Sequence, residues 1–232
     1  MMPWFIWKGK NSLSDFGLWI SKLPARTRAE ERHDEIEIPG RSGSLIMLEG
    51  DDVYSAFQME MTVTARNTLQ IDKIIEWLRG SGEFSLFNDT SKCWDARITN
   101  KVEFKRVGNN LQQAIISLLV QPFRHARFPI ENKITETGLS GSAINFGDVA
   151  SRPKVKITGS GNNTVTIGGK AMTFTSISSW ILVDCDAEIV TDANGIWSGS
   201  FSGEFWKIPK GSFTIAQTGS MTIEIDPEWR WF

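Results

Sequence analysis

Strict alternation of apolar and polar residues is the feature that most constrains the fold of this chain. In the segment 57–64, FQMEMTVT, every second residue is apolar, which predicts a strand with one face in a core and the other in solvent. After residue 128, seven further short strand-like segments are separated by turn sequences such as GSGNN, GGK, ANG and PKGS. Because no helical periodicity lies between them, this half predicts an antiparallel β-sandwich.

One segment departs from the strand pattern. Residues 69–79 place isoleucine and leucine at i, i+3, i+4 and i+7, which predicts an amphipathic helix. Asn67 is the expected N-cap and Gly80 the expected end. From Phe128 onward the chain becomes rich in Gly, Ser, Thr and Asn. We therefore predict a mainly β protein with a β-rich domain over 1–128 that has one α-helix, and a β-sandwich domain over 129–232.

The composition excludes several classes of protein. The 232 residues are 41% hydrophobic and 22% charged, with a formal net charge of −2, so neither half has the positive excess of a nucleic-acid-binding surface. No apolar run reaches the roughly 18–20 residues that cross a bilayer. The first ten residues, MMPWFIWKGK, lack the features of a signal peptide. We expect a protein made in the cytoplasm, without a membrane partner.

The chain offers little catalytic chemistry. It has none of the motifs of serine hydrolases, zinc proteases, calcium loops or phosphate-binding loops. Its two cysteines, Cys93 and Cys185, have no metal-ligand spacing. A Cys93/His125 dyad is conceivable, but one cysteine and one histidine anywhere in a chain are almost no signal, so inert structural roles are favoured. We predict no enzyme activity, no catalytic residue, no metal site and no cofactor.

The segment 35–45, EIEIPGRSGSL, superficially suggests a phosphate-binding loop. It has neither the lysine nor the following helix that such a loop needs, and it continues into the apolar LIML. Its two glycine-containing turn pairs instead predict a hairpin, with Ile36 and Ile38 facing inward. Arg41 is then exposed at the tip, where an arginine is suited to bind a partner's carboxylate.

Both ends of the chain carry a series of short motifs in a fixed order. The stretch WFIWKGKNSLSDFGLWISKLPARTRAEERHDEIEIPGRSGSL has an aromatic strand, a Lys-Gly turn, a Ser-x-Asp-Phe-Gly-Leu run, a Leu-Pro step and Glu-Ile-x-Ile-Pro-Gly-Arg-x-Gly-x-Leu. The far end has SRPKVKITGSGNNTVTIGGKAMTF and then SGEFWKIPKGSFTIAQTGSMTIEIDPEWRWF, closing on Pro-x-Trp-Arg-Trp. In this order the motifs resemble the distal tail protein (Dit) family of siphophages of Gram-positive hosts. The resemblance is weaker over 129–150, and Glu-Phe-Trp in SGEFWKIPKG stands where the family has Phe-Pro.

The resemblance implies a structural role in a long, non-contractile phage tail and no catalysis. Proteins of this family form a hexameric ring at the end of the tail tube, with the N-terminal domain in the ring and a galectin-like sandwich projecting outward. The implied partners are other copies of the chain, the tail tube protein, the tail-associated lysin or tail fibre protein, and receptor-binding proteins. The implied location is the virion tail tip, after assembly in the cytoplasm of the bacterial host.

A ring of this kind adds two groups of candidate residues. Arg41 is a candidate contact between subunits or with a partner. Because DNA must pass through the lumen without binding, the acidic residues Glu49, Asp51 and Asp52 are candidates to line it.

Three other functions remain as alternatives. A carbohydrate-binding module that attaches to the host cell wall would stack sugars on Trp180, Trp197 or Trp206, although packing in a core or interface is favoured for these rings. A β-sandwich glycosidase would need a carboxylate pair, and no pair stands out. A different baseplate or minor tail protein is the nearest alternative to a distal tail protein.

Overall fold

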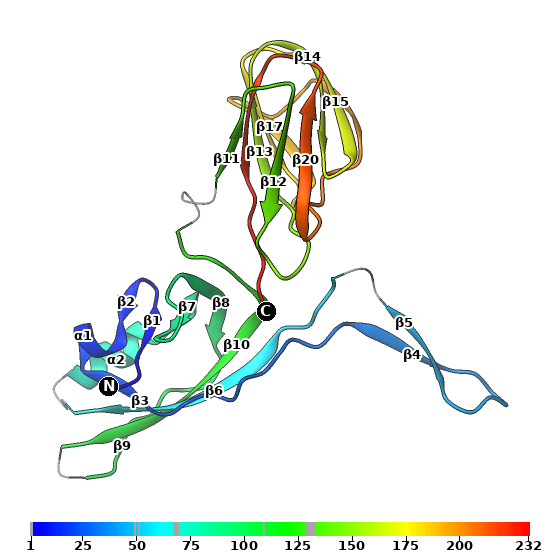
Figure 1. Cartoon of the computed structure of the whole chain (residues 1–232). Helices are drawn as coiled ribbons and strands as arrows, with labels where there is room; N and C mark the ends of the chain where they lie inside the picture. The colour runs from blue at the N-terminus through cyan, green and yellow to red at the C-terminus, as the bar shows by residue number, and fades with distance from the viewer. Residues whose placement is uncertain (1, 49, 51, 67–69, 109, 129–132) are drawn as a thin grey trace. The chain divides into compact units, whose positions relative to one another are not determined.

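The chain folds into two compact units in a computed structural model. The structure describes residues 2–48, 50, 52–66, 70–108, 110–128 and 133–232. The first unit comprises Met1–Arg127 together with Phe232, and the second comprises Phe128–Trp231. Most regular structure in both units is β-strand, which confirms the predicted mainly β class (Figure 1).

The first unit is built on one antiparallel sheet of eight strands in the order β2-β1-β7-β8-β10-β6-β3, with β9 also pairing with β10. In chain order its elements are β1 (Phe5–Trp7), β2 (Lys10–Asn11), α1 (Ser12–Phe16), β3 (Leu18–Lys22), β4 (His33–Glu37), β5 (Ser44–Leu48), β6 (Phe57–Ala65), α2 (Ile71–Trp77), β7 (Ser81–Leu86), β8 (Lys92–Ile98), β9 (Lys105–Arg106) and β10 (Gln112–Ala126).

The longest strand, β10, organises this sheet. It pairs with β6 from Gln112 opposite Ala65 to Val120 opposite Phe57. Its alternate residues are buried, as period-two alternation requires, and the intervening ones face outward. Its pairing with β8 shifts register between Val120 and Arg124, which is a bulge or irregularity in the strand.

The described residues contain two helices, so the prediction of one helix was incomplete. The short α1 was missed because five residues give no measurable periodicity. It depends on its caps: the Asn11 side chain accepts hydrogen bonds from the Leu13 and Ser14 amides, at 2.8 and 3.2 Å. Gly17 ends it in the left-handed conformation, with φ +63°. Neither helix is long and apolar enough to cross a membrane.

The predicted helix is present as α2, and two tryptophans hold it against β1. Ile74 and Leu78 are buried as the periodicity predicted. The Trp7 indole N–H donates to the Trp77 carbonyl at 3.1 Å, and the Trp77 indole N–H donates to the Trp7 carbonyl at 3.2 Å. The expected cap, Asn67, lies outside the described residues; the structure has Gln70 at the N-cap position, without a side-chain cap bond.

Strands β4 and β5 form a separate two-stranded hairpin that extends away from the sheet (Figure 1). Their register runs from His33 opposite Leu48 to Glu37 opposite Ser44. Gly40 and Gly43 adopt φ of +81° and +83° in the connection, values that glycine tolerates without strain. The predicted hairpin is therefore confirmed.

The second unit consists of two antiparallel sheets with a core between them, which confirms the predicted sandwich. The sheet orders are β11-β21-β13-β16-β17-β18 and β12-β20-β14-β15-β19. The strands are β11 (Ile134–Glu136), β12 (Ser140–Asn145), β13 (Lys154–Thr158), β14 (Gly161–Ile167), β15 (Lys170–Ile177), β16 (Trp180–Asp184), β17 (Ile189–Asp192), β18 (Gly195–Ile196), β19 (Ser200–Gly203), β20 (Gly211–Gln217) and β21 (Thr222–Asp226).

A buried amide pair closes one end of this sandwich. Asn163 donates to the Gln217 side-chain oxygen at 2.9 Å, and that oxygen also accepts from the Met221 amide at 3.2 Å. The Gln217 side-chain nitrogen donates to the carbonyls of Gly138 and Met221, at 2.9 and 2.7 Å. Each polar atom of the Gln217 side chain is thus satisfied inside the core, as buried polar groups require.

Removing this amide should destabilise the protein without changing the fold. We expect Gln217→Ala to lower the free energy of unfolding by about 1–3 kcal/mol, because buried carbonyl, amide and Asn163 groups lose their partners. Denaturant unfolding followed by tryptophan fluorescence measures this. Gln121→Ala, at an exposed position of β10, is the matched control and should change stability by less than about 0.5 kcal/mol. Equal stability of the two variants would contradict the assigned role.

Candidate interaction surface

The β4–β5 hairpin exposes a concentration of large apolar side chains. Every residue of both strands is exposed. We define the hairpin patch by its apolar members, with their exposed fractions: Ile36 44%, Ile38 38%, Leu45 41%, Ile46 60%, Met47 52% and Leu48 56%. An exposed apolar cluster of this kind is typical of a surface that binds another protein.

The apolar residues lie on both faces of the hairpin. Ile36 is opposite Leu45, whereas Ile46 is opposite Glu35, so neighbouring pairs along the ribbon point to opposite sides. The prediction that Ile36 and Ile38 point inward was wrong, because no second layer of the chain covers either face in the described structure. A two-stranded ribbon alone is only marginally stable in water, so this hairpin is suited to be held by a partner.

Arg41 lies in the connection at the tip of the hairpin. It is exposed, and its backbone amide donates to the Ile38 carbonyl at 3.1 Å. The fold therefore leaves its guanidinium accessible to another molecule, next to the hairpin patch.

The acidic cluster after the hairpin is only partly described. Glu49 and Asp51 lie outside the described residues. Asp52 is partly buried and has a left-handed backbone, with φ +60°. A role of these three residues in lining a lumen stays a prediction.

A second apolar surface lies on the outward face of β10. Ile115 is 50% exposed and Leu119 is 36% exposed. Leu119 lies opposite Gln58 of β6 on one side and Arg97 of β8 on the other. This outward face of the β8–β10–β6 sheet therefore mixes exposed apolar and polar side chains, unlike the more uniformly apolar hairpin patch.

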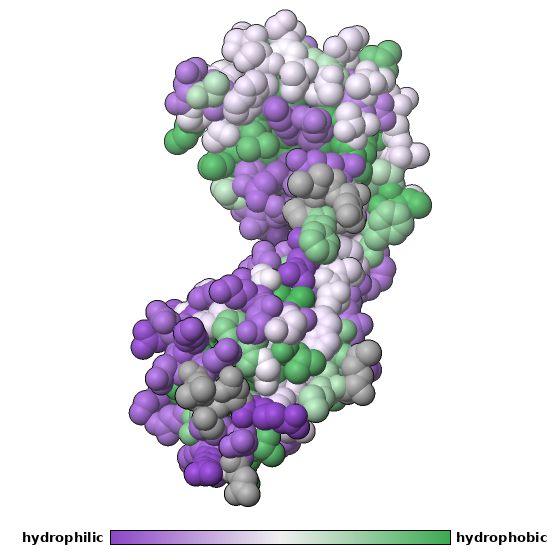
Figure 2. All heavy atoms as spheres, turned by 90° about the vertical axis from the view of Figure 1, so that its left-hand side faces the viewer, coloured by the Kyte–Doolittle hydropathy of each residue, from purple (hydrophilic) through white to green (hydrophobic). Residues whose placement is uncertain are grey.

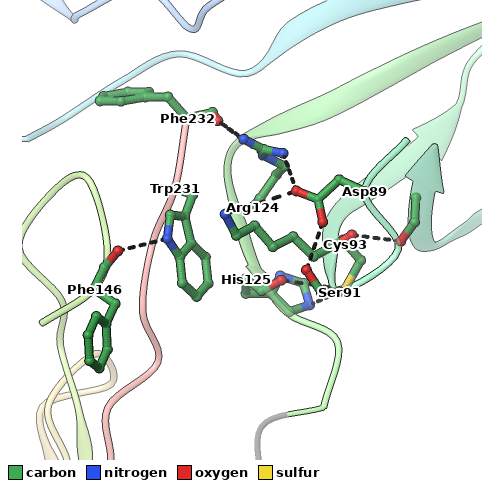
Figure 3. A network of polar contacts seen from close by, with 10 residues as sticks. Asp89, Ser91, Cys93, Arg124, His125, Phe146, Trp231 and Phe232 are labelled. Atoms are coloured by element: carbon green, nitrogen blue, oxygen red, sulfur yellow. Dashed lines mark hydrogen bonds and ion pairs between the residues drawn. The ribbon is translucent and has the colours of Figure 1, made fainter. Parts of the chain in front are cut away.

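The structure brings together the two residues of the dyad that the sequence did not favour. His125 of β10 is the register partner of Cys93 of β8, and their Nε2 and Sγ atoms lie 3.1 Å apart (Figure 3). On the other side of the imidazole, Nδ1 lies 3.8 Å from a carboxylate oxygen of Asp95. Nearby, Arg124 forms a 3.1 Å ion pair with Asp89 (Figure 3).

The electrostatics of this pair oppose nucleophilic catalysis. The pKa of Cys93 is raised to about 12, chiefly by burial and then by the carboxylates of Glu83 and Asp95, against the opposing effect of Arg127. A catalytic cysteine needs a lowered pKa, because the thiolate is the nucleophile. In the structure as it stands the Cys93 thiol is neutral near pH 7.

Two of the three tryptophans that a carbohydrate-binding module would use are buried, in agreement with the favoured prediction of core packing. Trp197 and Trp206 are 8% and 1% exposed and belong to the sandwich core. Trp180 is partly exposed, with the Lys156 ammonium 5.5 Å from its ring centre. The visible surface of this unit is mostly of intermediate hydropathy, in keeping with its Gly, Ser and Thr content (Figure 2).

A cavity of about 390 Å³ in the second unit has a charged lining that is largely paired. Among the lining residues, Lys170 pairs with Glu204 at 2.5 Å, and Arg152 lies 3.8 Å from Glu188. Trp206 contributes to the wall but its ring is buried. The cavity therefore offers little aromatic surface to a sugar from this tryptophan.

The fold is similar to that of a known protein, although the sequence is not. No family model and no curated protein matches the sequence. Among solved structures, the chain is similar to the crystal structure of the Dit protein of phage SPP1, with a TM-score of 0.72 and 14% sequence identity, over 97% of this chain and 98% of that one. This chain has the fold of a siphophage distal tail protein. The resemblance seen in the sequence motifs is thereby confirmed at the level of the fold.

The SPP1 protein is described as a paradigm of the hub adsorption apparatus in phages that infect Gram-positive bacteria. Its match to nearly the whole of both chains includes both units of the present fold. At 14% identity the match concerns the course of the backbone. It carries no information about the hairpin patch or Cys93, whose description rests on the structure of this chain alone.

The raised pKa of Cys93 predicts slow alkylation. With a pKa of about 12 instead of 9.0, its thiolate population at pH 8 is about a thousandfold smaller than that of an ordinary thiol. Cys185 is buried and has a similarly raised pKa. Iodoacetamide at pH 8, followed by intact mass, should label both thiols slowly in the native protein and rapidly after denaturation. Rapid native labelling of Cys93 would contradict this and restore a nucleophilic role.

Proposed function

We propose that this chain is a structural protein of the tip of a long, non-contractile phage or prophage tail, and that it assembles there as a hexameric ring. The observation that carries the proposal is the match in fold to the SPP1 Dit protein over 97% of the chain. The sequence motifs at both ends of the chain support it. The raised pKa of Cys93, the candidate nucleophile, disfavours catalysis and is a further argument for a structural role.

In this proposal the two parts of the chain have different roles. Residues 1–128 form the ring, and residues 129–232 form a galectin-like sandwich. The ring links the tail tube protein to the tail-associated lysin or tail fibre protein, and carries receptor-binding proteins. Assembly takes place in the host cytoplasm, and the protein then remains in the virion tail tip.

Two surfaces of the first unit that expose apolar side chains support ring formation. A closed ring has a heterologous interface, in which each subunit presents two different patches. The hairpin patch is one candidate, and the outward face of the β8–β10–β6 sheet, with Ile115 and Leu119, is the other. The acidic strand β4, HDEIE, meets a surface that includes the exposed Arg97 in this arrangement, which pairs opposite charges.

The lumen of such a ring passes DNA without binding it. Glu49, Asp51 and Asp52 follow the hairpin in the sequence and are proposed to line the lumen, where like charge repels phosphate.

The hairpin patch gives a direct test of the ring. Mass photometry of the purified chain should show a species of six times the 26.0 kDa chain mass, or twice that if two rings stack. The double variant Ile46→Asp with Leu48→Asp should shift most of the protein to monomer, because buried carboxylates would replace apolar contacts at the interface.

The matched control is Ile196→Asp, which alters an equally apolar residue, 83% exposed, on β18 of the second unit. Circular dichroism should be the same for all proteins, because the altered side chains are exposed within the chain. A monomeric wild type would refute self-assembly of the free chain, and a hexameric double variant would remove the hairpin from the interface.

Arg41 is proposed to bind a carboxylate of the neighbouring subunit or of a partner. A hydrogen bond to a charged group contributes about 1.5–3 kcal/mol, so Arg41→Glu should raise the concentration needed for ring assembly at least about tenfold. Size-exclusion chromatography with light scattering over a dilution series measures this. Lys210→Glu, an exposed lysine in the second unit, is the control. A ring as stable as the wild type would exclude Arg41 from the subunit interface.

A further inference from the structure

Three metal-ligating side chains meet on one face of the first unit. Glu83 of β7, Cys93 of β8 and His125 of β10 each place one ligand atom within 4.8 Å of the others. Strand register explains the meeting, because His125 is opposite Cys93, and Glu83 is opposite Asp95, two residues along β8. Residues two apart on a strand share a face. No metal-binding motif is visible in the sequence, because these ligands lie on three separate strands.

The donor set and its dimensions suit zinc. Thiolate, imidazole and carboxylate are the ligands that Zn²⁺ takes in proteins, commonly as three protein ligands with water in the fourth position. From the usual zinc–ligand bond lengths, donors around one tetrahedral ion lie about 3.3–3.6 Å apart. Cys93 Sγ and His125 Nε2 are 3.1 Å apart, somewhat closer than this, so a small rotation of either side chain would accommodate the ion. Glu83 is exposed, so its side chain is free to close the remaining gap.

A neighbouring carboxylate is placed to orient the imidazole. Asp95 Oδ2 lies 3.8 Å from His125 Nδ1, on the side of the ring away from Cys93. A metal-bound histidine almost always donates its other N–H to such a group, which fixes the tautomer and ring orientation. Nε2 is then the nitrogen that faces Cys93 and Glu83.

The charges and exposure at this place also favour a divalent cation. The anionic Cys93 thiolate and Glu83 carboxylate together balance two positive charges. Asp95 adds a further carboxylate, and Arg127 opposes it. Cys93 is fully buried, His125 is partly buried and Glu83 is exposed, so an ion has a route from solvent along Glu83.

We propose that Glu83, Cys93 and His125 bind one Zn²⁺ ion, with Asp95 as a positioning residue for His125. The ion joins three neighbouring strands of the first unit. It lies beyond the register shift in β10, where only Arg124, His125 and Ala126 continue the pairing with β8. Its effect is to fix this last part of β10 to the sheet, and the proposal does not depend on ring assembly.

Cobalt(II) is the probe for this site, because a cysteine-bound Co²⁺ ion has a thiolate-to-metal charge-transfer absorption. The full-length, reduced protein should take up one Co²⁺ per chain with this absorption, and Zn²⁺ should displace it. Cys93→Ser should abolish the absorption, whereas Cys185→Ser, which removes the other buried thiol, should retain it. Absence of the absorption in the wild type, or its persistence in Cys93→Ser, would overturn the proposal.

The other ligands are tested by affinity and stability. Glu83→Gln and His125→Gln should weaken Co²⁺ binding at least tenfold, and Asp95→Asn should weaken it about 10–100-fold. His33→Gln, at the other histidine, should leave it unchanged. Zn²⁺ should raise the melting temperature of the wild type and not of Cys93→Ser. Unaltered affinity in Glu83→Gln, an exposed position at which the fold is not at risk, would also count against the site.

Discussion

The pairing of β10 with β6 is the interaction on which the rest of the first unit depends. Nine consecutive residue pairs join the two strands, and the alternate residues of β10 supply the centre of the core. β8 and β9 pair with the same strand, and β7 and β1 follow through β8. The register of β10 therefore decides which residues are buried, which form the outward apolar face, and which side chain faces Cys93. A shift by one residue would reverse all three, because successive side chains point to opposite faces.

The hairpin patch is the part of the fold that the chain does not complete by itself. Most other long strands of the described structure place one apolar face in one of two cores, but β4 and β5 pair only with each other and contribute to neither core. Apolar residues on both sides of an isolated ribbon suit insertion between surfaces more than docking on one. This physical argument favours contact with a partner and is independent of the match in fold.

The environment of Cys93 also disfavours nucleophilic catalysis. Burial and two neighbouring carboxylates keep the free thiol neutral, which disfavours a nucleophile. Glu83 and His125, with Cys93 itself, form a set of donors for a cation. A bound cation would reverse the preference by stabilising the thiolate. Cys93, the candidate nucleophile of the sequence analysis, is thus better suited to hold strands together. A metal ion bound there would act within one chain, whereas the proposed contact of the hairpin would act between chains.

The sequence alone determined the mainly β class, the helix near Ile74, the hairpin and the exposure of Arg41, since short-range periodicity and turn residues encode all of these. It did not reveal α1, whose five residues depend on capping by Asn11 rather than on periodicity. Nor did it show that Ile36 is exposed, because alternation indicates that a strand has two faces but not which of them another layer covers. The contact of Cys93 with His125, 32 residues apart, was decided by tertiary structure alone, because long-range strand register and not local sequence sets which side chains meet.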